Sequence, residues 1–176
     1  MKTVNLHGFM GEADNKNYKA LCSIFTPENI VSPQLQYKDS SPAELLDMLS
    51  TMVTPEVGLF VGQSLGGWYA DQLSRTFQRP CILTNPCYRP HELKLITESG
   101  ISADFVEQYM SLSALEKNEC AIVLCSAADT VLPDNYDTCL KLSRNVIRVH
   151  GSHSTIENLS AELRNAFKYV MEERYG

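Results

Sequence analysis

The stretch Val57-Gly58-Leu59-Phe60-Val61-Gly62-Gln63-Ser64-Leu65-Gly66-Gly67-Trp68 decides how the rest of the sequence is interpreted. Its first part, Val57 to Val61, is a short apolar run with β-branched ends, which predicts a buried strand. The pattern from Leu65 to Phe77 has helical periodicity. The stretch therefore predicts a strand that turns directly into a helix, with Ser64 at the turn.

Small residues on both sides of Ser64 are what such a turn requires. A serine there has a sharply bent backbone, and the strand and the helix approach each other closely two residues before and two residues after it. Gly62 and Gly66 occupy these positions. The turn would raise the Ser64 hydroxyl above the carboxyl edge of a sheet and place the Leu65 amide at a helix N-terminus, where it can donate to an oxyanion.

Two other interpretations of this turn exist. It can be a glycine-rich turn in which the serine is incidental. It can also be a phosphate-binding loop, but such a loop ends in G-K-[ST], and this sequence has no lysine there. We therefore favour a nucleophilic serine.

Apolar, β-branched runs alternate with helical segments along the whole chain, a pattern typical of an α/β fold. We expect a mostly parallel central sheet of about six strands with helices on both faces, the α/β-hydrolase arrangement. The expected strands are Thr3–Leu6, Asn29–Val31, Val57–Val61, Cys81–Thr84, Ala121–Cys125 and Val146–His150. The expected helices are Asn17–Phe25, Pro42–Val53, Leu65–Phe77, Asp134–Leu142 and Thr155–Arg174.

The chain length of 176 residues predicts a single domain, residues 1–176. The longest connection runs from Asn85 to Glu119 and includes the amphipathic stretch Ser102–Leu115. Residues 86–119 are therefore a candidate for a small lid. The alternative is that the apolar side chains of this stretch only cover the sheet. These side chains are Phe105, Tyr109, Met110 and Leu112.

Composition and charge argue against several classes of partner. The net charge of −6 and the lack of a basic cluster make nucleic acid an unfavourable partner. The longest apolar run, Cys120–Ala128, is about half of the roughly 18 residues that a membrane span needs. A strand is expected directly after Met1, which leaves no room for a signal peptide. With six cysteines expected as reduced thiols, we predict a soluble cytoplasmic protein.

A nucleophilic serine needs a histidine to accept its proton and a carboxylate to orient that histidine. In hydrolases of this fold the order along the chain is serine, acid, histidine. His150 and His153 both follow the last strand, and we favour His153 because His150 is expected to end the strand itself. His91 precedes every candidate acid and is expected on the surface.

Asp129 is the favoured acid because it follows the Ala121–Cys125 strand by a short turn, at the edge where the histidine loop arrives. Asp134 and Asp137 open the next helix and are expected as a cap and as part of a solvated face. Asp71 and Asp104 belong to helices that give them no reason to face the site.

The loop His7-Gly8-Phe9-Met10-Gly11 follows the first strand and is expected to supply the second oxyanion donor. Either the Phe9 amide or the Met10 amide can serve, and we favour Phe9. A histidine at the start of such a loop more often bonds the backbone than acts as a base. The residues expected to line the substrate pocket are His7, Met10, Tyr88 and Arg89, with Lys94 near its mouth.

Several motifs together resemble the YqiA-like esterases of the α/β-hydrolase superfamily, also grouped as the UPF0227 proteins. The resemblance extends over nearly the whole chain, and the Asn-Pro with a downstream Arg-Pro is its most distinctive part. The motifs are His7-Gly8-Phe9, Pro33-Gln34-Leu35, Pro42-Ala43-Glu44-Leu45-Leu46, Ser64-Leu65-Gly66-Gly67-Trp68-Tyr69-Ala70, Asn85-Pro86-Cys87-Tyr88-Arg89-Pro90 with Glu92-Leu93, Asp129 before Val131-Leu132, and Gly151-Ser152-His153.

The resemblance implies an esterase or thioesterase with a minimal hydrolase core and no metal or organic cofactor. The expected substrate is a small-molecule ester or thioester. The expected catalytic residues are Ser64, Asp129 and His153, with Phe9 and Leu65 as the oxyanion hole. The alternative is a non-catalytic interaction protein that retains the fold without efficient turnover.

Overall fold

The computed structural model describes residues 1–175, with side chains to Glu172, and contains a six-stranded sheet of order β2-β1-β3-β4-β5-β6. Every neighbouring pair in this sheet is parallel. The strands are β1 Lys2–Leu6, β2 Ile30–Val31, β3 Val57–Gln63, β4 Cys81–Thr84, β5 Asn118–Ser126 and β6 Ser143–Val149. The predicted α/β class and the predicted set of strands are thus confirmed, with shifted ends.

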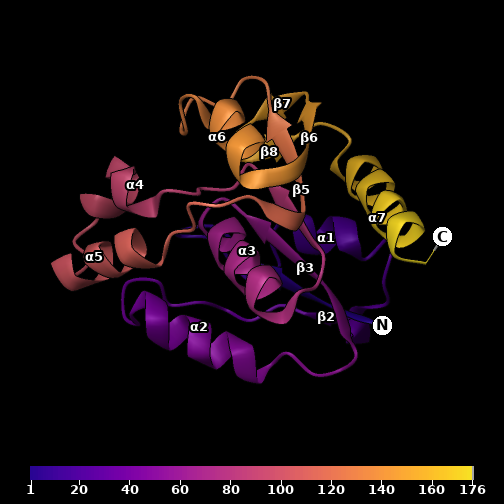
Figure 1. Cartoon of the computed structure of the whole chain (residues 1–176), viewed down its shortest axis with the longest axis horizontal. Coiled ribbons are helices and arrows are strands. Elements are labelled where there is room, and N and C mark those ends of the chain that lie inside the picture. Colours follow the sequence, from indigo (N-terminus) through magenta and orange to yellow (C-terminus); the bar gives the residue numbers. More distant parts are fainter. Residues whose placement is uncertain (176) are drawn as a thin grey trace.

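Helices cover both faces of the sheet (Figure 1). They are α1 Lys16–Leu21, α2 Pro42–Thr51, α3 Leu65–Phe77, α4 Lys94–Thr97, α5 Ala103–Leu112, α6 Asn135–Leu142 and α7 Leu159–Tyr175, with 3₁₀ helices η1 Pro27–Asn29 and η2 Pro90–Glu92. Alternate strand residues point to opposite faces. Phe60 packs in the core under α2, α3 and α6, whereas Leu59 and Val61 pack in the core under α1 and α7.

The parallel order brings loops from distant parts of the sequence to one edge of the sheet. The carboxyl ends of β1, β3, β4, β5 and β6 all lie at this edge, because each strand runs in the same direction as its neighbours. This is the edge at which ligands bind in open α/β sheets. The candidate residues of these five loops can therefore meet only here.

Segment 86–119 contains η2, α4 and α5, and α5 packs beside α2 and η2 (Figure 1). Tyr109 of α5 lies against the rings of Trp68 and Tyr69 on α3, and its hydroxyl is 2.9 Å from the Tyr69 hydroxyl. Met110 remains 59% exposed. Helix α5 therefore packs on α3 through Tyr109.

The last helix begins later than expected, at Leu159 instead of Thr155. Two short strands, β7 Gly151–Ser152 and β8 Thr155–Ile156, pair antiparallel before it. Gly151 has φ +130°, a conformation that residues with a Cβ rarely adopt, and the hairpin turns at His153 and Ser154. The first two residues of the predicted helix, Thr155 and Ile156, therefore belong to a tight hairpin.

Helix α1 is shorter than the predicted Asn17–Phe25, because the chain leaves the α-helix after Leu21. Ser23 Oγ donates to the Ala20 carbonyl at 2.8 Å, and the Ile24 amide donates to the Leu21 carbonyl at 2.8 Å. Such side-chain bonds and i→i+3 bonds compete with regular helix. The apolar pattern continues to Phe25, but the backbone does not follow it.

All six cysteines are free thiols; four are buried, Cys120 is half-buried and Cys22 is exposed. Within residues 1–175, no helix is both long enough and apolar enough to cross a bilayer.

Candidate active site

Ser64 lies at the turn between β3 and α3 with φ +51° and ψ −118°, a conformation that few non-glycine residues adopt. A Cβ on Gly62 would overlap the carbonyl of Gly66, and a Cβ on Gly66 would overlap the carbonyl of Leu6. The two glycines therefore allow strand, helix and β1 to approach at this point. Leu65 begins α3, so its amide has no acceptor within the helix.

The structure brings Ser64, His153 and Asp129 together from three separate loops. His153 Nε2 is 2.9 Å from Ser64 Oγ, and His153 Nδ1 is 2.8 Å from Asp129 Oδ2. The side chains of His153 and Asp129 are 13% and 3% exposed. The three residues thus form a continuous line of hydrogen bonds at the carboxyl edge of the sheet, largely shielded from solvent.

Asp129 is held by its own turn as well as by His153. Its Oδ1 accepts from the amides of Val131 and Leu132 at 2.9 and 3.0 Å. Burial raises the pKa of this carboxyl, but the bonds from His153 and from these two amides outweigh it and leave the pKa below its ordinary value. An ionised carboxylate only accepts, so His153 Nδ1 carries a proton and Nε2 is free to accept from Ser64.

The loop after β1 lies directly beside Ser64. A Cβ built on Gly8 would be 3.3 Å from Ser64 Cβ. His7, at the start of this loop, is 1% exposed, and its Nε2 accepts from the Leu35 amide at 2.9 Å. Nδ1 must then carry the proton and donate to the Gly8 carbonyl, 2.8 Å away. Burial lowers the pKa of His7, in accord with a neutral ring.

These bonds orient the peptide that joins Gly8 to Phe9. The Gly8 carbonyl also accepts from the Gly11 amide at 2.9 Å. No peptide within residues 1–175 is cis, and in a trans peptide the C=O and N–H bonds point in opposite directions. The Phe9 N–H therefore points away from His7 and Gly11. Because His7 is enclosed and both its nitrogens are engaged, the prediction that His7 lines the pocket is wrong.

Asn85 is a residue of this site that the sequence interpretation did not assign a role. It follows β4, is 1% exposed, and bonds the hairpin that carries His153. The Asn85-Pro86 motif marked this residue in the sequence as distinctive. Its meaning required knowing that the end of β4 lies beneath the His153 hairpin.

The residues expected in the pocket lie in different surroundings. Met10 is 68% exposed and lines an open groove of about 710 Å³ between residues 9–14 and residues 34–39. Arg89 lines a separate cavity of about 260 Å³ and lies 3.5 Å from a Glu92 carboxylate oxygen. Tyr88 is buried, and its hydroxyl bonds Ser143 Oγ at 2.6 Å. Ser143 begins β6, so the Tyr88 hydroxyl points toward the opposite end of the sheet from Ser64, while Tyr88 also lines the cavity of about 260 Å³ beside Arg89.

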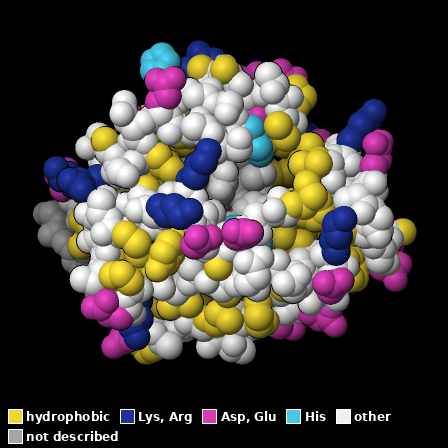
Figure 2. All heavy atoms as spheres, turned by 180° about the vertical axis from the view of Figure 1, so that it is seen from behind, with side chains coloured by type: hydrophobic (Ala, Val, Ile, Leu, Met, Phe, Trp, Pro, Cys, Tyr) yellow, Lys and Arg dark blue, Asp and Glu magenta, His cyan; other side chains and the backbone are white. Residues whose placement is uncertain are grey.

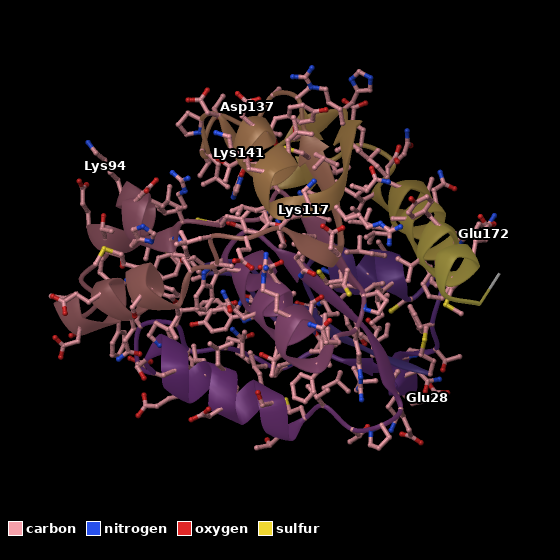
Figure 3. The ribbon with its side chains drawn as sticks, viewed as in Figure 1. Glu28, Lys94, Lys117, Asp137, Lys141 and Glu172 are labelled. Carbon is pink, nitrogen blue, oxygen red and sulfur yellow. The ribbon has the colours of Figure 1, made fainter. Side chains whose placement is uncertain are left out.

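Figure 2 shows a face hollowed near its middle, with basic and acidic side chains around the hollow and hydrophobic side chains beside it. Lys94 on α4 points away from the body of the molecule (Figure 3), so the expectation that it lies at the pocket mouth is not supported. Asp137 is exposed on α6, as expected (Figure 3).

The other candidate residues do not join the site. His150 is exposed, and Asp71 is buried against Arg75 at 2.8 Å. His91 is half-buried, with 18% of its side chain exposed, and lies 3.6 Å from Glu92. Asp134 occupies the N-cap position of α6 but makes no capping bond, because it has φ +59°. Among the side chains that the structure describes, to Glu172, no cluster of three or more His, Cys, Asp or Glu residues is arranged to bind a metal ion.

The sheet order and the strand-turn-helix at Ser64 define an α/β-hydrolase fold, and solved structures agree. Alpha/beta hydrolase domain-containing protein 10 from mouse is similar at 14% identity, over 99% of this chain and 90% of that chain, with a TM-score of 0.71. Metagenome-derived lipolytic enzymes LipS and LipT match at 16% identity, over 97% and 93%, with a TM-score of 0.68. The RedJ thioesterase of the prodiginine pathway in Streptomyces coelicolor matches at 14% identity, over 97% and 90%, with a TM-score of 0.57.

The family assignment is more specific than the fold. The uncharacterised protein family UPF0227 matches residues 2–171, nearly the whole chain. The chain belongs to that family, which confirms the resemblance found in the sequence.

Proposed function

We propose that this protein is a serine hydrolase that cleaves a small acyl ester or thioester, with Ser64 as nucleophile, His153 as general base and Asp129 as the orienting acid. The observation that carries the proposal is the line of hydrogen bonds at 2.9 and 2.8 Å from Ser64 through His153 to Asp129. Its hydrogen-bonding roles match what a nucleophilic serine requires. The likeness of the fold to esterases and thioesterases supports the same class.

The reaction proceeds by acyl transfer in two halves. Ser64 Oγ attacks the carbonyl carbon while its proton passes to His153 Nε2. The tetrahedral intermediate then collapses, the C–O or C–S bond breaks, and His153 returns the proton to the leaving alcohol or thiol. Water, activated by His153, attacks the acyl-serine in the same way. The carboxylic acid leaves, and Ser64 regains its proton.

The oxyanion of each intermediate is held by the amides of Leu65 and Phe9. Leu65 supplies the first unpaired amide of α3, where the helix dipole also favours negative charge. The Phe9 amide is favoured over the Met10 amide because the Gly8 carbonyl, bonded by His7 and Gly11, turns the Phe9 N–H in the opposite direction. Gly8 brings that peptide next to Ser64.

The groove beside Met10 is the proposed binding region for the substrate. It begins at Phe9, whose N–H is proposed to bind the oxyanion, and its volume of about 710 Å³ is ample for a small ester or thioester. Apolar parts of Phe9, Met10 and Leu35 line it together with polar side chains. Residues 86–119 remain a candidate lid, because they follow β4 at the same edge of the sheet.

Replacement of the nucleophile tests the proposal. Purified Ser64→Ala should lose hydrolysis of p-nitrophenyl butyrate by at least about 10³-fold, because no other group can form the acyl-enzyme. A fluorophosphonate should label the native chain at Ser64. Ser154→Ala, an exposed serine in the neighbouring hairpin turn, is the matched control and should keep both properties.

Two outcomes would count against the proposal. Undiminished ester hydrolysis by Ser64→Ala would remove Ser64 from the reaction. A native chain that reacts with neither ester nor fluorophosphonate would favour the non-catalytic alternative. A panel of matched acyl esters and thioesters then separates esterase from thioesterase activity.

A further inference from the structure

The hairpin that carries His153 must cross two strand ends before it reaches Ser64. Ser64 follows β3 and His153 follows β6, and β4 and β5 lie between these strands. Neighbouring strands are about 4.8 Å apart, so β3 and β6 are separated by roughly 14 Å. The hairpin therefore needs an attachment along the crossing if Nε2 is to stay at hydrogen-bonding distance from Ser64.

Asn85 at the end of β4 lies under this crossing and bonds the hairpin. Its Nδ2 donates to the carbonyls of Ser152 and His153, at 3.1 and 2.9 Å. Its Oδ1 accepts from the Ser126 amide at 2.6 Å, where β5 ends and the turn toward Asp129 begins. Carbonyls only accept and a backbone amide only donates, so these partners determine which end of the carboxamide is which.

The backbone around Asn85 is joined to Ser64 from both sides. The Ser64 amide donates to the Thr84 carbonyl at 3.1 Å, and the Cys87 amide donates to the Ser64 carbonyl at 2.9 Å. Asn85 itself has φ +43°, a region in which asparagine is one of the few favoured residues. The segment from Thr84 to Cys87 therefore bonds Ser64 through its backbone. Through the Asn85 side chain it also bonds the loop of His153 and the start of the loop of Asp129.

We propose that Asn85 is a positioning residue, whose carboxamide holds the His153 hairpin over the ends of β4 and β5 so that Nε2 meets Ser64 Oγ. This proposal rests on the proposed roles of Ser64 and His153. Lys16 also bonds the hairpin, at the Ser154 carbonyl, but from an exposed position. The buried Ser126 hydroxyl donates to the Gly151 carbonyl at the base of the hairpin. Asn85 supplies the buried attachment nearest the turn, at Ser152 and His153. A displacement of about 1 Å at a reacting group can cost about 10²-fold in rate, which sets the expected effect.

Two substitutions separate the parts played by the carboxamide. Asn85→Asp retains an oxygen toward the Ser126 amide, but places a second oxygen against the carbonyls of Ser152 and His153. Asn85→Gly accommodates φ +43° and removes the carboxamide. Both variants should lower kcat for p-nitrophenyl butyrate about 10²-fold with KM within about threefold of native, and should slow fluorophosphonate labelling of Ser64 similarly.

Asn118→Ala is the matched control. Asn118 is also a buried asparagine, and its Nδ2 donates to Asp71 Oδ1 at 2.8 Å, but it lies at the start of β5, the opposite end of the sheet. This variant should lower Tm and keep kcat within about twofold, measured well below its Tm. If the folded Asn85 variants likewise lose Tm but keep native kcat, the positioning role is overturned.

The resonance of the His153 Nδ1 proton tests Asn85 without any substrate. In the native chain this proton lies in the bond to Asp129 and should give a downfield NMR signal. Its loss or shift in both Asn85 variants supports the proposal, and an unchanged signal refutes it. A native chain that fails to hydrolyse esters and to react with fluorophosphonate overturns the proposed function instead, and this signal still decides the role of Asn85.

Discussion

Two substitutions of His7 should rank in opposite order for stability and for activity: His7→Asn should lose more stability, and His7→Gln should lose more activity. Its Nδ1–H donates to the Gly8 carbonyl, and its Nε2 accepts from the Leu35 amide. His7→Asn places an amide nitrogen near the position of Nδ1, so it keeps the bond to Gly8 and loses the bond to Leu35. His7→Gln reaches the position of Nε2, so it keeps the bond to Leu35 and loses the bond to Gly8.

The expected magnitudes follow from what each variant leaves unpaired. His7→Asn leaves the buried Leu35 amide without a partner, which costs about 1–3 kcal/mol. In His7→Gln the Gly8 carbonyl still accepts from Gly11, so the loss is about 0.5–1.5 kcal/mol. At about 2–4 °C per kcal/mol for a domain of this size, Tm should fall further in His7→Asn than in His7→Gln.

Activity should follow the other order. His7→Gln frees the Gly8–Phe9 peptide to rotate, and complete loss of one oxyanion donor costs about 10²- to 10³-fold in kcat. We therefore expect kcat of His7→Gln to fall by about 10- to 10²-fold and kcat of His7→Asn to stay within about threefold of native. Thermal unfolding and p-nitrophenyl butyrate kinetics on the same preparations measure both orders. Native kcat in His7→Gln together with reduced kcat in His7→Asn would refute the reasoning.

Two further predictions concern the acid and the turn at Ser64. In Asp129→Asn the new amide should donate to His153 Nδ1, which moves the ring proton to Nε2. We therefore expect kcat to fall about 10³- to 10⁴-fold. Fluorescence or CD should show that the variant keeps the native fold. Gly66→Ala should prevent folding or destabilise the fold by roughly 3–5 kcal/mol, which lowers Tm by about 6–20 °C, because its Cβ would overlap the Leu6 carbonyl. Gly100→Ala, with φ +86° and open space around it, should cost only about 1–2 kcal/mol.

Asp129→Asn also carries a pH test. The folded-state pKa of Asp129 lies below its ordinary value, so its ionisation stabilises the fold above about pH 4, and this contribution is lost as pH falls through the lowered pKa. The variant should therefore lose less stability than the native chain between neutral pH and acid. An equally steep acid loss in both would show that other carboxyls dominate, and equal kcat in both would remove Asp129 from the reaction.

Local sequence was sufficient wherever a short stretch has one physical solution. The run from Val57 into Leu65 allowed the strand, the sharp turn and the helix to be predicted, because Gly62 and Gly66 are the residues that a close approach demands. Apolar, β-branched runs that alternate with helical segments predicted the parallel sheet with helices on both faces. The order of Ser64, Asp129 and His153 along the chain selected three residues that the structure places within hydrogen-bonding distance.

Contacts between residues distant in the sequence could not be predicted from local patterns. The hairpin at Gly151–Ile156 was predicted as a loop that enters a helix at Thr155, because two short strands carry too few residues to show a period. Tyr88 was expected in the pocket although its hydroxyl bonds Ser143, and His7 was expected there although it is enclosed. In each case the direction of a side chain depends on neighbours that are distant in the sequence.

Sequence alone determined which backbone each segment can form, since sterics and burial act over a few residues at a time. Only the tertiary structure decided which groups pair across the edge of the sheet. It determined which nitrogen of His7 carries the proton, and hence the direction of the Phe9 amide. It also placed the carboxamide of Asn85 beneath the His153 hairpin. Hydrogen bonds are directional and short, so their partners depend on strand order and on the crossing of loops. Neither can be read from local pattern.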